Sequence, residues 1–305
     1  MTPRAGLSVR LASVLLLGIV ALPLPAQTPG VEQRRTMEAG GSRRSYLLYV
    51  PTSHRADRLL PLVLVFHGAG GRGRGMARHT GFTRLAEREG FAVVYPDGLD
   101  RRWNDGRGIG GSQDDVGFVR ALLDSLEREL GVDRRRIYAT GISNGAMFSH
   151  RLACDLPGVL AAIAPVAGAL PAALAERCAG AAPVAVVAFQ GTADAFVPYD
   201  GGGVVRRRGT VLGAGASAAF WAGINGCGGP HETGPPTDSV TDGTRLRRES
   251  WAGCREDRSV VLYTILGGGH TWPGGGDGTR RIGRASREID ATRAIWDFFQ
   301  RHPRT

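Results

Sequence analysis

Short apolar segments alternate with segments of helical periodicity along this chain, and this alternation restricts its possible folds more than any other feature. A strand with alternating polar and apolar residues is predicted at 43–50. Continuous apolar runs, typical of strands buried in a parallel sheet, lie at 61–66, 91–95, 136–139, 184–189 and 260–265. Helices are predicted at 82–88, 118–130, 146–154 and 289–301. The pattern indicates the α/β class, with a mostly parallel, doubly wound sheet flanked by helices.

The length of 305 residues allows one large α/β domain or two smaller ones. No internal repeat is visible. The Gly-rich stretches at 201–203 and 228–243 are typical of surface insertions and do not resemble linkers between domains. We therefore expect a single domain from residue 35 to residue 305.

The first 26 residues differ in composition from the rest of the chain. Arg4 and Arg10 give a basic start, residues 11–22 are apolar, and Leu24-Pro25-Ala26 is a small-residue cleavage site, which is the pattern of a secretory signal peptide. A membrane anchor is the alternative, but the apolar run is shorter than the ~20 residues that span a bilayer. We expect a signal peptide at residues 1–26, a secreted protein and no membrane association.

Four cysteines remain in the chain, and an even number in an exported protein favours disulfides. Three pairings are possible, and proximity along the sequence suggests Cys154 with Cys178 and Cys227 with Cys254. Metal binding is the competing interpretation, but the sequence contains no close Cys/His spacing of the kind that zinc sites use. We expect disulfides and no metal site.

The formal net charge of +10 raises the question of an acidic partner such as nucleic acid. All 38 basic residues are arginines, and they are scattered along the chain. Their pairs and triplets at 34–35, 134–136 and 206–208 have no interleaved aromatic residues. We interpret them as solvated surface and expect no nucleic-acid partner.

The strongest local signal is the segment Gly141-Ile142-Ser143-Asn144-Gly145, between the strand predicted at 136–139 and the helix predicted at 146–154. A serine on a tight strand-to-helix turn is exposed at the carboxyl end of the sheet, and small flanking residues let the backbone pass without clashes. This setting predicts that Ser143 is a nucleophile.

A serine hydroxyl needs a neighbouring base to take its proton, and that base needs an orienting acid. His270 follows the last predicted strand and is the candidate base. Asp194 follows the strand at 184–189 and is the candidate acid, with Asp200 as an alternative. The order Ser, Asp, His along the chain is that of the α/β-hydrolase fold. The chemistry requires no cofactor.

A developing oxyanion needs backbone N–H donors, one after the nucleophile and one from an early loop. Asn144 and Ala69, the latter in the segment HGAGG at 67–71, are the candidates, and His67 is expected to be structural. Gly68, Gly70 and Gly73 with Asp97 also match a dinucleotide-binding fingerprint. In a dinucleotide-binding fold, the glycine-rich turn runs directly into a helix. In this chain we expect the glycines at 73 and 75 to interrupt a helix at that position.

Two tryptophans are candidates for substrate contacts. Trp103, in a loop with Asn104 and Asp105, is placed to stack on a substrate ring, and Trp272 lies two residues from His270. The alternative for both tryptophans is core packing.

These segments together resemble the polyhydroxybutyrate depolymerase/feruloyl esterase family of secreted esterases. The resemblance covers nearly all of the chain after the signal peptide. It lies in PLVLVFHGAGG, YPDGLDRRWND, DDVGFVRALLD, RRIYATGISNGAMFSHRLAC, LAAIAPVAGAL, FQGTADAFVPY and GGGHTWPGG. One departure is Gln190, where members often carry His before Gly-Thr.

The resemblance implies the α/β-hydrolase fold and hydrolysis of carboxylic esters, with Ser143 as nucleophile, Asp194 as acid and His270 as base. No appended polymer-binding domain is visible, so we expect soluble hydroxybutyrate oligomers, or feruloyl and acetyl groups on plant polysaccharide, as substrates. A peptidase or an acyltransferase on the same fold, and a non-catalytic binding protein that kept the fold, are the alternatives.

Overall fold

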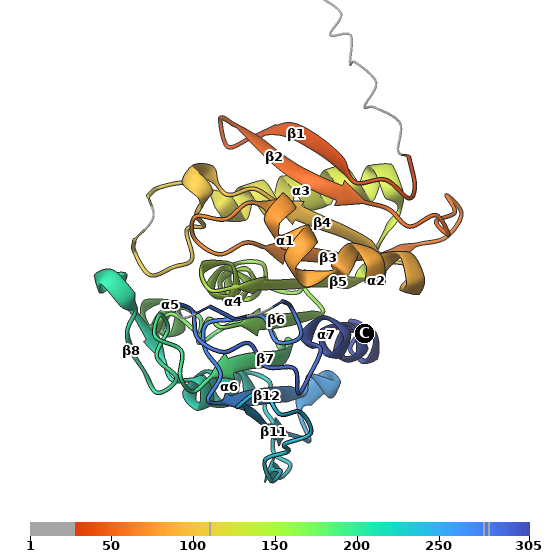
Figure 1. Ribbon diagram of the computed structural model, residues 1–305. Coiled ribbons are helices and arrows are strands. Elements are labelled where there is room, and N and C mark those ends of the chain that lie inside the picture. The colour runs from red at the N-terminus through yellow and green to blue at the C-terminus, as the bar shows by residue number, and fades with distance from the viewer. Residues whose placement is uncertain (1–27, 110, 277, 280) are drawn as a thin grey trace, which may run out of the picture.

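A single large sheet organises the computed structural model, which describes residues 28–109, 111–276, 278–279 and 281–305 (Figure 1). The strand order is β1-β2-β4-β3-β5-β6-β7-β12-β11-β10. The strands are β1 (Gln33–Ala39), β2 (Ser42–Tyr49), β3 (Leu60–Phe66), β4 (Ala92–Pro96), β5 (Val132–Ile142), β6 (Ala162–Val166), β7 (Ala185–Gly191), β10 (His231–Thr233), β11 (Arg245–Trp251) and β12 (Val260–Leu266). The six central strands, from β4 to β12 in this order, are parallel, and the strands at both edges are antiparallel.

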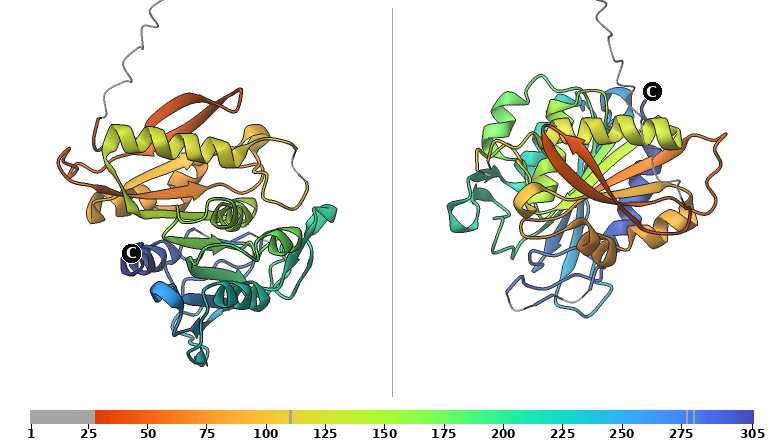
Figure 2. Two further views of the ribbon diagram at one scale, coloured as in Figure 1. Left: turned by 180° about the vertical axis from the view of Figure 1, so that it is seen from behind. Right: turned by 90° about the horizontal axis from the view of Figure 1, so that it is seen from above.

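Helices cover both faces of the sheet (Figure 2). They are α1 (Gly73–Thr80), α2 (Phe82–Glu89), α3 (Asp115–Leu130), α4 (Asn144–Asp155), α5 (Ala172–Arg177), α6 (Ala214–Ile224) and α7 (Ala291–Arg301). Along β3, Leu62, Leu64 and Phe66 pack with α3, α4 and α6, whereas Val63 and Val65 pack with α1, α2 and α7. Successive side chains of a strand point to opposite faces, so one apolar run supplies two cores.

The predicted fold class is confirmed, because the helices and the parallel strands form a doubly wound α/β sheet in one domain. The buried strands and the main helices lie within a few residues of their predicted positions. The predicted signal peptide, residues 1–26, lies outside the described residues. Strand β1 begins at Gln33, and the domain boundary at residue 35 stays a prediction.

The helix α1 corrects one expectation. We expected glycines 73 and 75 to interrupt any helix, but α1 begins at Gly73, whose N–H donates to Oδ1 of Asp97 at 2.8 Å. The other oxygen of Asp97 accepts from the Ser45 hydroxyl at 2.8 Å. In a dinucleotide-binding fingerprint, the carboxylate of Asp97 would bind a ribose. Here both of its oxygens already accept hydrogen bonds from within the protein.

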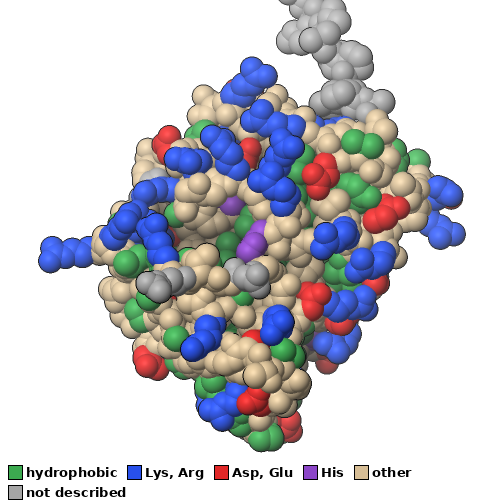
Figure 3. All heavy atoms as spheres, viewed as in Figure 1, with side chains coloured by type: hydrophobic (Ala, Val, Ile, Leu, Met, Phe, Trp, Pro, Cys, Tyr) green, Lys and Arg blue, Asp and Glu red, His purple; other side chains and the backbone are tan. Residues whose placement is uncertain are grey.

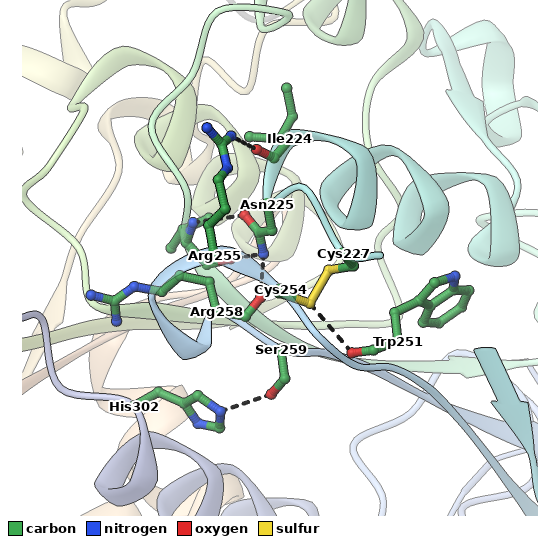
Figure 4. The surroundings of a disulfide bond; sticks show 10 residues. Ile224, Asn225, Cys227, Trp251, Cys254, Arg255, Arg258, Ser259 and His302 are labelled. Carbon is green, nitrogen blue, oxygen red and sulfur yellow. Dashed lines mark hydrogen bonds between the residues drawn. A yellow bond between two sulfur atoms is a disulfide. The ribbon is translucent and has the colours of Figure 1, made fainter. Parts of the chain in front are cut away.

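Two disulfides join Cys154 to Cys178 and Cys227 to Cys254, which confirms the predicted pairing. The first links the end of α4 to the segment after α5. Figure 4 shows the second disulfide beside Asn225. The Asn225 side chain bonds both backbone groups of Val184 and the carbonyl of Arg258, so α6, β7 and β12 meet at this point.

A search of the described residues finds no helix that is both long enough and apolar enough to cross a membrane.

Candidate active site

The turn from β5 into α4 places Ser143 at the carboxyl end of the central parallel strands. Ser143 has φ +59° and ψ −120°, a conformation that residues with a side chain rarely adopt. The neighbouring glycines make the turn possible: a Cβ on Gly145 would lie 2.4 Å from the carbonyl oxygen of Phe66, and one on Gly141 would lie 2.7 Å from the same atom. The pattern G-x-S-x-G therefore reflects the close approach of α4 to β3.

The loops after β7 and β12 bring His270 to Asp194. Because these strands are neighbours in the sheet, their carboxyl ends carry the two side chains to the same edge. Nδ1 of His270 lies 2.8 Å from Oδ2 of Asp194, whose side chain is fully buried. The alternative acid, Asp200, is exposed just before β8 (Gly201–Gly203). The structure thus favours Asp194 as the partner of His270.

Asp194 is held by further donors. Its Oδ1 accepts from the backbone N–H groups of Phe196 at 2.8 Å and Val197 at 2.9 Å. Its Oδ2 also accepts from Nε2 of Gln190 at 3.1 Å. The Phe196 ring stacks on the His270 ring, with 5.0 Å between their centroids. Both the carboxylate and the imidazole are therefore fixed in orientation.

A cavity of about 580 Å³ opens over this edge of the sheet. Ser143, His270, Ala69 and Asn144 all line it, so the structure brings the predicted nucleophile, base and oxyanion donors together. Figure 3 shows the hollow, with histidine side chains inside it and arginines along its rim.

The backbone N–H groups of Ala69 and Asn144 are available at this cavity. Among the described residues, none accepts a hydrogen bond from either group, whereas the N–H of Gly70 donates to Arg101 and that of Gly71 to Gly68. Unpaired N–H donors beside a nucleophilic serine are the arrangement that stabilises an oxyanion.

Asn144 is fixed by a network that the sequence analysis did not identify. Its Oδ1 accepts from the N–H of Trp103 at 2.8 Å, and its Nδ2 donates to Oδ2 of Asp105 at 2.6 Å. Asp105 is fully buried and forms an ion pair with Arg107, with 2.6 Å from Nη2 to Oδ2. The loop residue Asp105 thus positions Asn144, the residue that follows Ser143.

The prediction that Trp103 and Trp272 contact substrate is corrected. Trp103 is 1% exposed and stacks on Phe148, and Trp272 is 0% exposed and packs edge-on against Phe82. Neither indole lines the cavity. Their N–H groups are bonded within the fold, to the His67 carbonyl and the Thr292 hydroxyl, so both tryptophans are core residues.

His67 has a structural role, as the sequence indicated. Its Nε2 accepts from the N–H of Gly98 at 3.0 Å, and its Nδ1 bonds the carbonyl of Gly68 at 2.8 Å. Burial lowers the pKa of His67, and both ring nitrogens hold the loop that contains Ala69.

Within the described ranges, no group of three or more His, Cys, Asp or Glu side chains is arranged to hold a metal ion.

Comparisons with known proteins agree with this geometry. A family model described as "Esterase PHB depolymerase" matches residues 44–196, about half of the chain. The protein NocK of Nocardia uniformis subsp. tsuyamanensis is 33% identical over 282 residues, which cover 87% of this chain and 81% of NocK. Feruloyl esterase C of Emericella nidulans is 27% identical over 300 residues, 96% of this chain and 98% of the esterase.

A solved structure, the acetyl xylan esterase from Aspergillus awamori, superposes with a TM-score of 0.60 at 18% identity, over 79% of this chain and 94% of that one. The fold and these relatives define a carboxylic ester hydrolase with the α/β-hydrolase fold. More specifically, the chain belongs to the PHB depolymerase esterase family.

Proposed function

We propose that this esterase works through a Ser143–His270–Asp194 triad and an acyl-enzyme intermediate. The observation that carries the proposal is the 2.8 Å contact between His270 and Asp194 at the cavity that Ser143 also lines. Because Oδ2 of Asp194 accepts a hydrogen bond from Nδ1 of His270, the ring proton lies on Nδ1. Nε2 of His270 is then free to act as the base.

In the first half of the reaction, the Ser143 oxygen forms a bond to the ester carbonyl carbon while Nε2 of His270 takes its proton. The carbonyl π electrons move to oxygen, and the N–H groups of Ala69 and Asn144 stabilise that charge. When the carbonyl re-forms, the bond to the alcohol oxygen breaks, and His270 returns the proton to the departing alkoxide. Asp194 stabilises the imidazolium in between.

In the second half, water attacks the acyl-serine ester and His270 again takes the proton. Collapse of the second tetrahedral intermediate breaks the bond to the Ser143 oxygen, which regains its proton from His270, and the carboxylic acid is released. The alcohol leaves with the proton that Ser143 gave up, and water supplies both the hydroxyl of the acid and the proton that Ser143 regains. The enzyme therefore returns to its starting state with no co-reactant beyond water.

The names of the relatives support feruloyl, acetyl or hydroxybutyrate esters as substrates. We propose that these are feruloyl or acetyl groups on plant polysaccharide, or oligomers of 3-hydroxybutyrate. Two disulfides support folding in an oxidising compartment, and we propose that the protein acts outside the cytoplasm after removal of residues 1–26.

Labelling with a fluorophosphonate probe tests the nucleophile. The wild-type protein and Ser53→Ala, an exposed serine remote from the cavity, should be labelled and active, whereas Ser143→Ala should be neither. Turnover of Ser143→Ala should fall by several orders of magnitude. Labelling or near-normal turnover in Ser143→Ala would overturn the triad.

Substrate preference is tested by the ratio of kcat/KM for methyl ferulate to kcat/KM for a 3-hydroxybutyrate dimer. A ratio far above one favours plant cell-wall esters, and a ratio far below one favours polyester oligomers. A panel of amides and alcohol acceptors separates hydrolysis of esters from peptidase and acyltransferase activity. Wild-type protein that neither reacts with the probe nor cleaves any ester would instead be a binding protein on this fold.

A further inference from the structure

The cavity over Ser143 is strongly cationic. Six arginines line it, from four separate parts of the chain: Arg72, Arg102, Arg107, Arg206, Arg208 and Arg281. None of the described residues that line it is an aspartate or a glutamate. The whole chain has 28 acidic residues for its 38 arginines, so the ratio of basic to acidic residues is much higher in the cavity lining than in the chain. Figure 3 shows arginines on the rim of the hollow.

Among the described residues, Arg107 is the arginine of this set that forms an ion pair with a carboxylate. Its guanidinium forms a bidentate pair with the buried Asp105, and its remaining Nη1 donates to the carbonyl of Arg208 at 2.7 Å. That bond holds the turn between β8 and β9 (Thr210–Leu212) against the loop of Asp105. Arg107 therefore positions a second, unneutralised cation, Arg208, at the cavity.

The other five arginines differ from Arg107 in this respect. In the described part of the chain, none of them forms an ion pair with a carboxylate, although other arginines on the surface do, such as Arg136 with Asp133 and Arg151 with Asp155. Partial burial and then the positive charges of Arg102, Arg206 and Arg107 lower the pKa of Arg208, which indicates mutual repulsion among these cations.

We propose, building on the esterase function proposed above, that this cavity selects esters that carry a carboxylate, which Arg102 and Arg208 bind next to the scissile bond. A guanidinium binds a carboxylate through two parallel charge-assisted hydrogen bonds, and a concave site of one sign concentrates ligands of the opposite sign. A bound carboxylate also relieves the repulsion among the arginines. Two kinds of ester have such a group: oligomeric hydroxy acids, through their free terminus, and esters on uronic acid sugars.

Matched substrate pairs test the proposal and separate these two sources. One pair is the 3-hydroxybutyrate dimer and its terminal primary amide. The other is a methyl O-acetylgalacturonide and its uronamide. Each pair differs only in the charge of one group remote from the ester. The wild-type enzyme should show a kcat/KM about tenfold or more higher for the carboxylate in one pair. The pair that responds identifies the source of the carboxylate.

The variants Arg102→Gln and Arg208→Gln should lose most of that preference, measured as the ratio of kcat/KM for each carboxylate to kcat/KM for its amide. The control is Arg128→Gln, an exposed arginine of α3 that does not line the cavity, and it should keep the preference. Raising the ionic strength from about 0.05 M to about 0.5 M should also weaken the preference, because the Debye length falls.

Equal kcat/KM within both pairs, with hydrolysis that still depends on Ser143, overturns the carboxylate proposal and leaves the esterase mechanism intact. A preference that Arg128→Gln removes as completely as Arg208→Gln also overturns it, since the effect would then come from net charge. Failure of the wild-type enzyme to exceed Ser143→Ala on every ester is a different result, because it removes the proposed mechanism on which the inference rests.

Discussion

Nε2 of Gln190 and Nδ1 of His270 share one acceptor, Oδ2 of Asp194, at 3.1 and 2.8 Å. The carboxylate therefore receives side-chain donors from β7 and from the loop after β12 on its Oδ2, and two backbone N–H groups on its Oδ1. Four donors on one buried carboxylate leave it a single orientation. Gln190 stands where members of the family often carry histidine, and its side chain contacts the acid of the proposed triad.

Asp194→Asn tests the role of the acid. The amide keeps the shape of the side chain but presents an N–H to His270, which favours the wrong tautomer of the ring. We expect kcat to fall by about 10⁴ with little change in KM. Steady-state kinetics on a chromogenic ester measure this. Asp200→Asn is the matched control and should retain wild-type kcat. Equal losses in the two variants would contradict the assignment.

Gln190 makes a smaller contribution, which a conservative pair of variants can isolate. Gln190→Leu removes one donor to Asp194 and leaves the Val197 carbonyl without its partner. We expect kcat to fall about tenfold, since a hydrogen bond to a charged group contributes about 1.5–3 kcal/mol. Gln190→His restores a donor and should recover most of the activity. If the histidine variant is as slow as the leucine variant, packing at this position matters more than the hydrogen bond.

Asp105→Asn tests the network behind the oxyanion donors. The substitution removes the charge that pairs with Arg107 and weakens the acceptor for Nδ2 of Asn144. Because the N–H of Asn144 would act only when the oxyanion forms, kcat should fall by about ten- to a hundredfold while KM stays within about twofold. A rise in KM alone would indicate that the loop shapes the substrate pocket and not the oxyanion site. Thermal unfolding of the same variant separates this effect from loss of structure.

A pair of glycine variants tests the packing of the serine turn. The Cβ of Gly145→Ala would lie 2.4 Å from the Phe66 carbonyl oxygen and 2.7 Å from that of His67, so β3 and α4 must move apart. We expect the free energy of unfolding to fall by about 1–3 kcal/mol and activity to be lost. Gly215 lies on the exposed side of α6, where an added Cβ would meet no atom within 4 Å. Gly215→Ala should therefore raise the free energy of unfolding by about 0.5–1 kcal/mol. Chemical denaturation measures both values.

Buried histidines predict a loss of stability in acid. Burial lowers the pKa of His150 from its ordinary value of 6.5 to about 3, and its Nδ1 accepts from Nε1 of Trp221 at 2.9 Å. Between these two pH values the unfolded chain binds a proton that the folded chain does not, so stability falls as the pH drops below 6.5. From pH 6.5 to pH 5, this one group should cost about 2 kcal/mol.

His150→Gln is the test of that prediction, because the glutamine oxygen can still accept from Trp221 and does not titrate. The variant should be less stable than the wild type at pH 7.5, yet its free energy of unfolding should decline less steeply between pH 6.5 and pH 5. Parallel slopes for the two proteins would show that other groups control the acid response.

The parallel strands and the candidate site could be predicted because each has a strong local signature. A run such as β3 is apolar on both faces, and the pattern G-x-S-x-G around Ser143 is short and contiguous, because the close approach of α4 to β3 requires both glycines. The edge strand β1 and the strand β11, which lies next to the other edge, were not predicted. They carry several arginines and have one face toward solvent, so their apolar signal is weak, and charge of this kind keeps sheet edges from pairing with other chains.

The roles of Trp103 and Asp105 could not be predicted, because they depend on contacts between distant segments. Proximity to the candidate site suggested that Trp103 faces substrate, but its ring fills the space between β3 and α4. Asp105 is buried only because Asn144 and Arg107 satisfy its oxygens, and these lie on different elements. The arginine triplet at 206–208 looked like ordinary surface, and only the folded hairpin brings Arg206 and Arg208 to the cavity.

The proposed triad and the cavity arginines occupy different kinds of position in the fold. Ser143, Asp194 and His270 follow three strands of the central sheet, where neighbouring backbone atoms restrict each side chain. Arg72, Arg206 and Arg281 lie on exposed segments outside the strands. Mutations of these arginines can therefore reverse the charge at the rim of the cavity without moving the reacting atoms. A lineage with this scaffold can change the esters that it accepts within a few substitutions, while the bond-breaking chemistry is inherited unchanged.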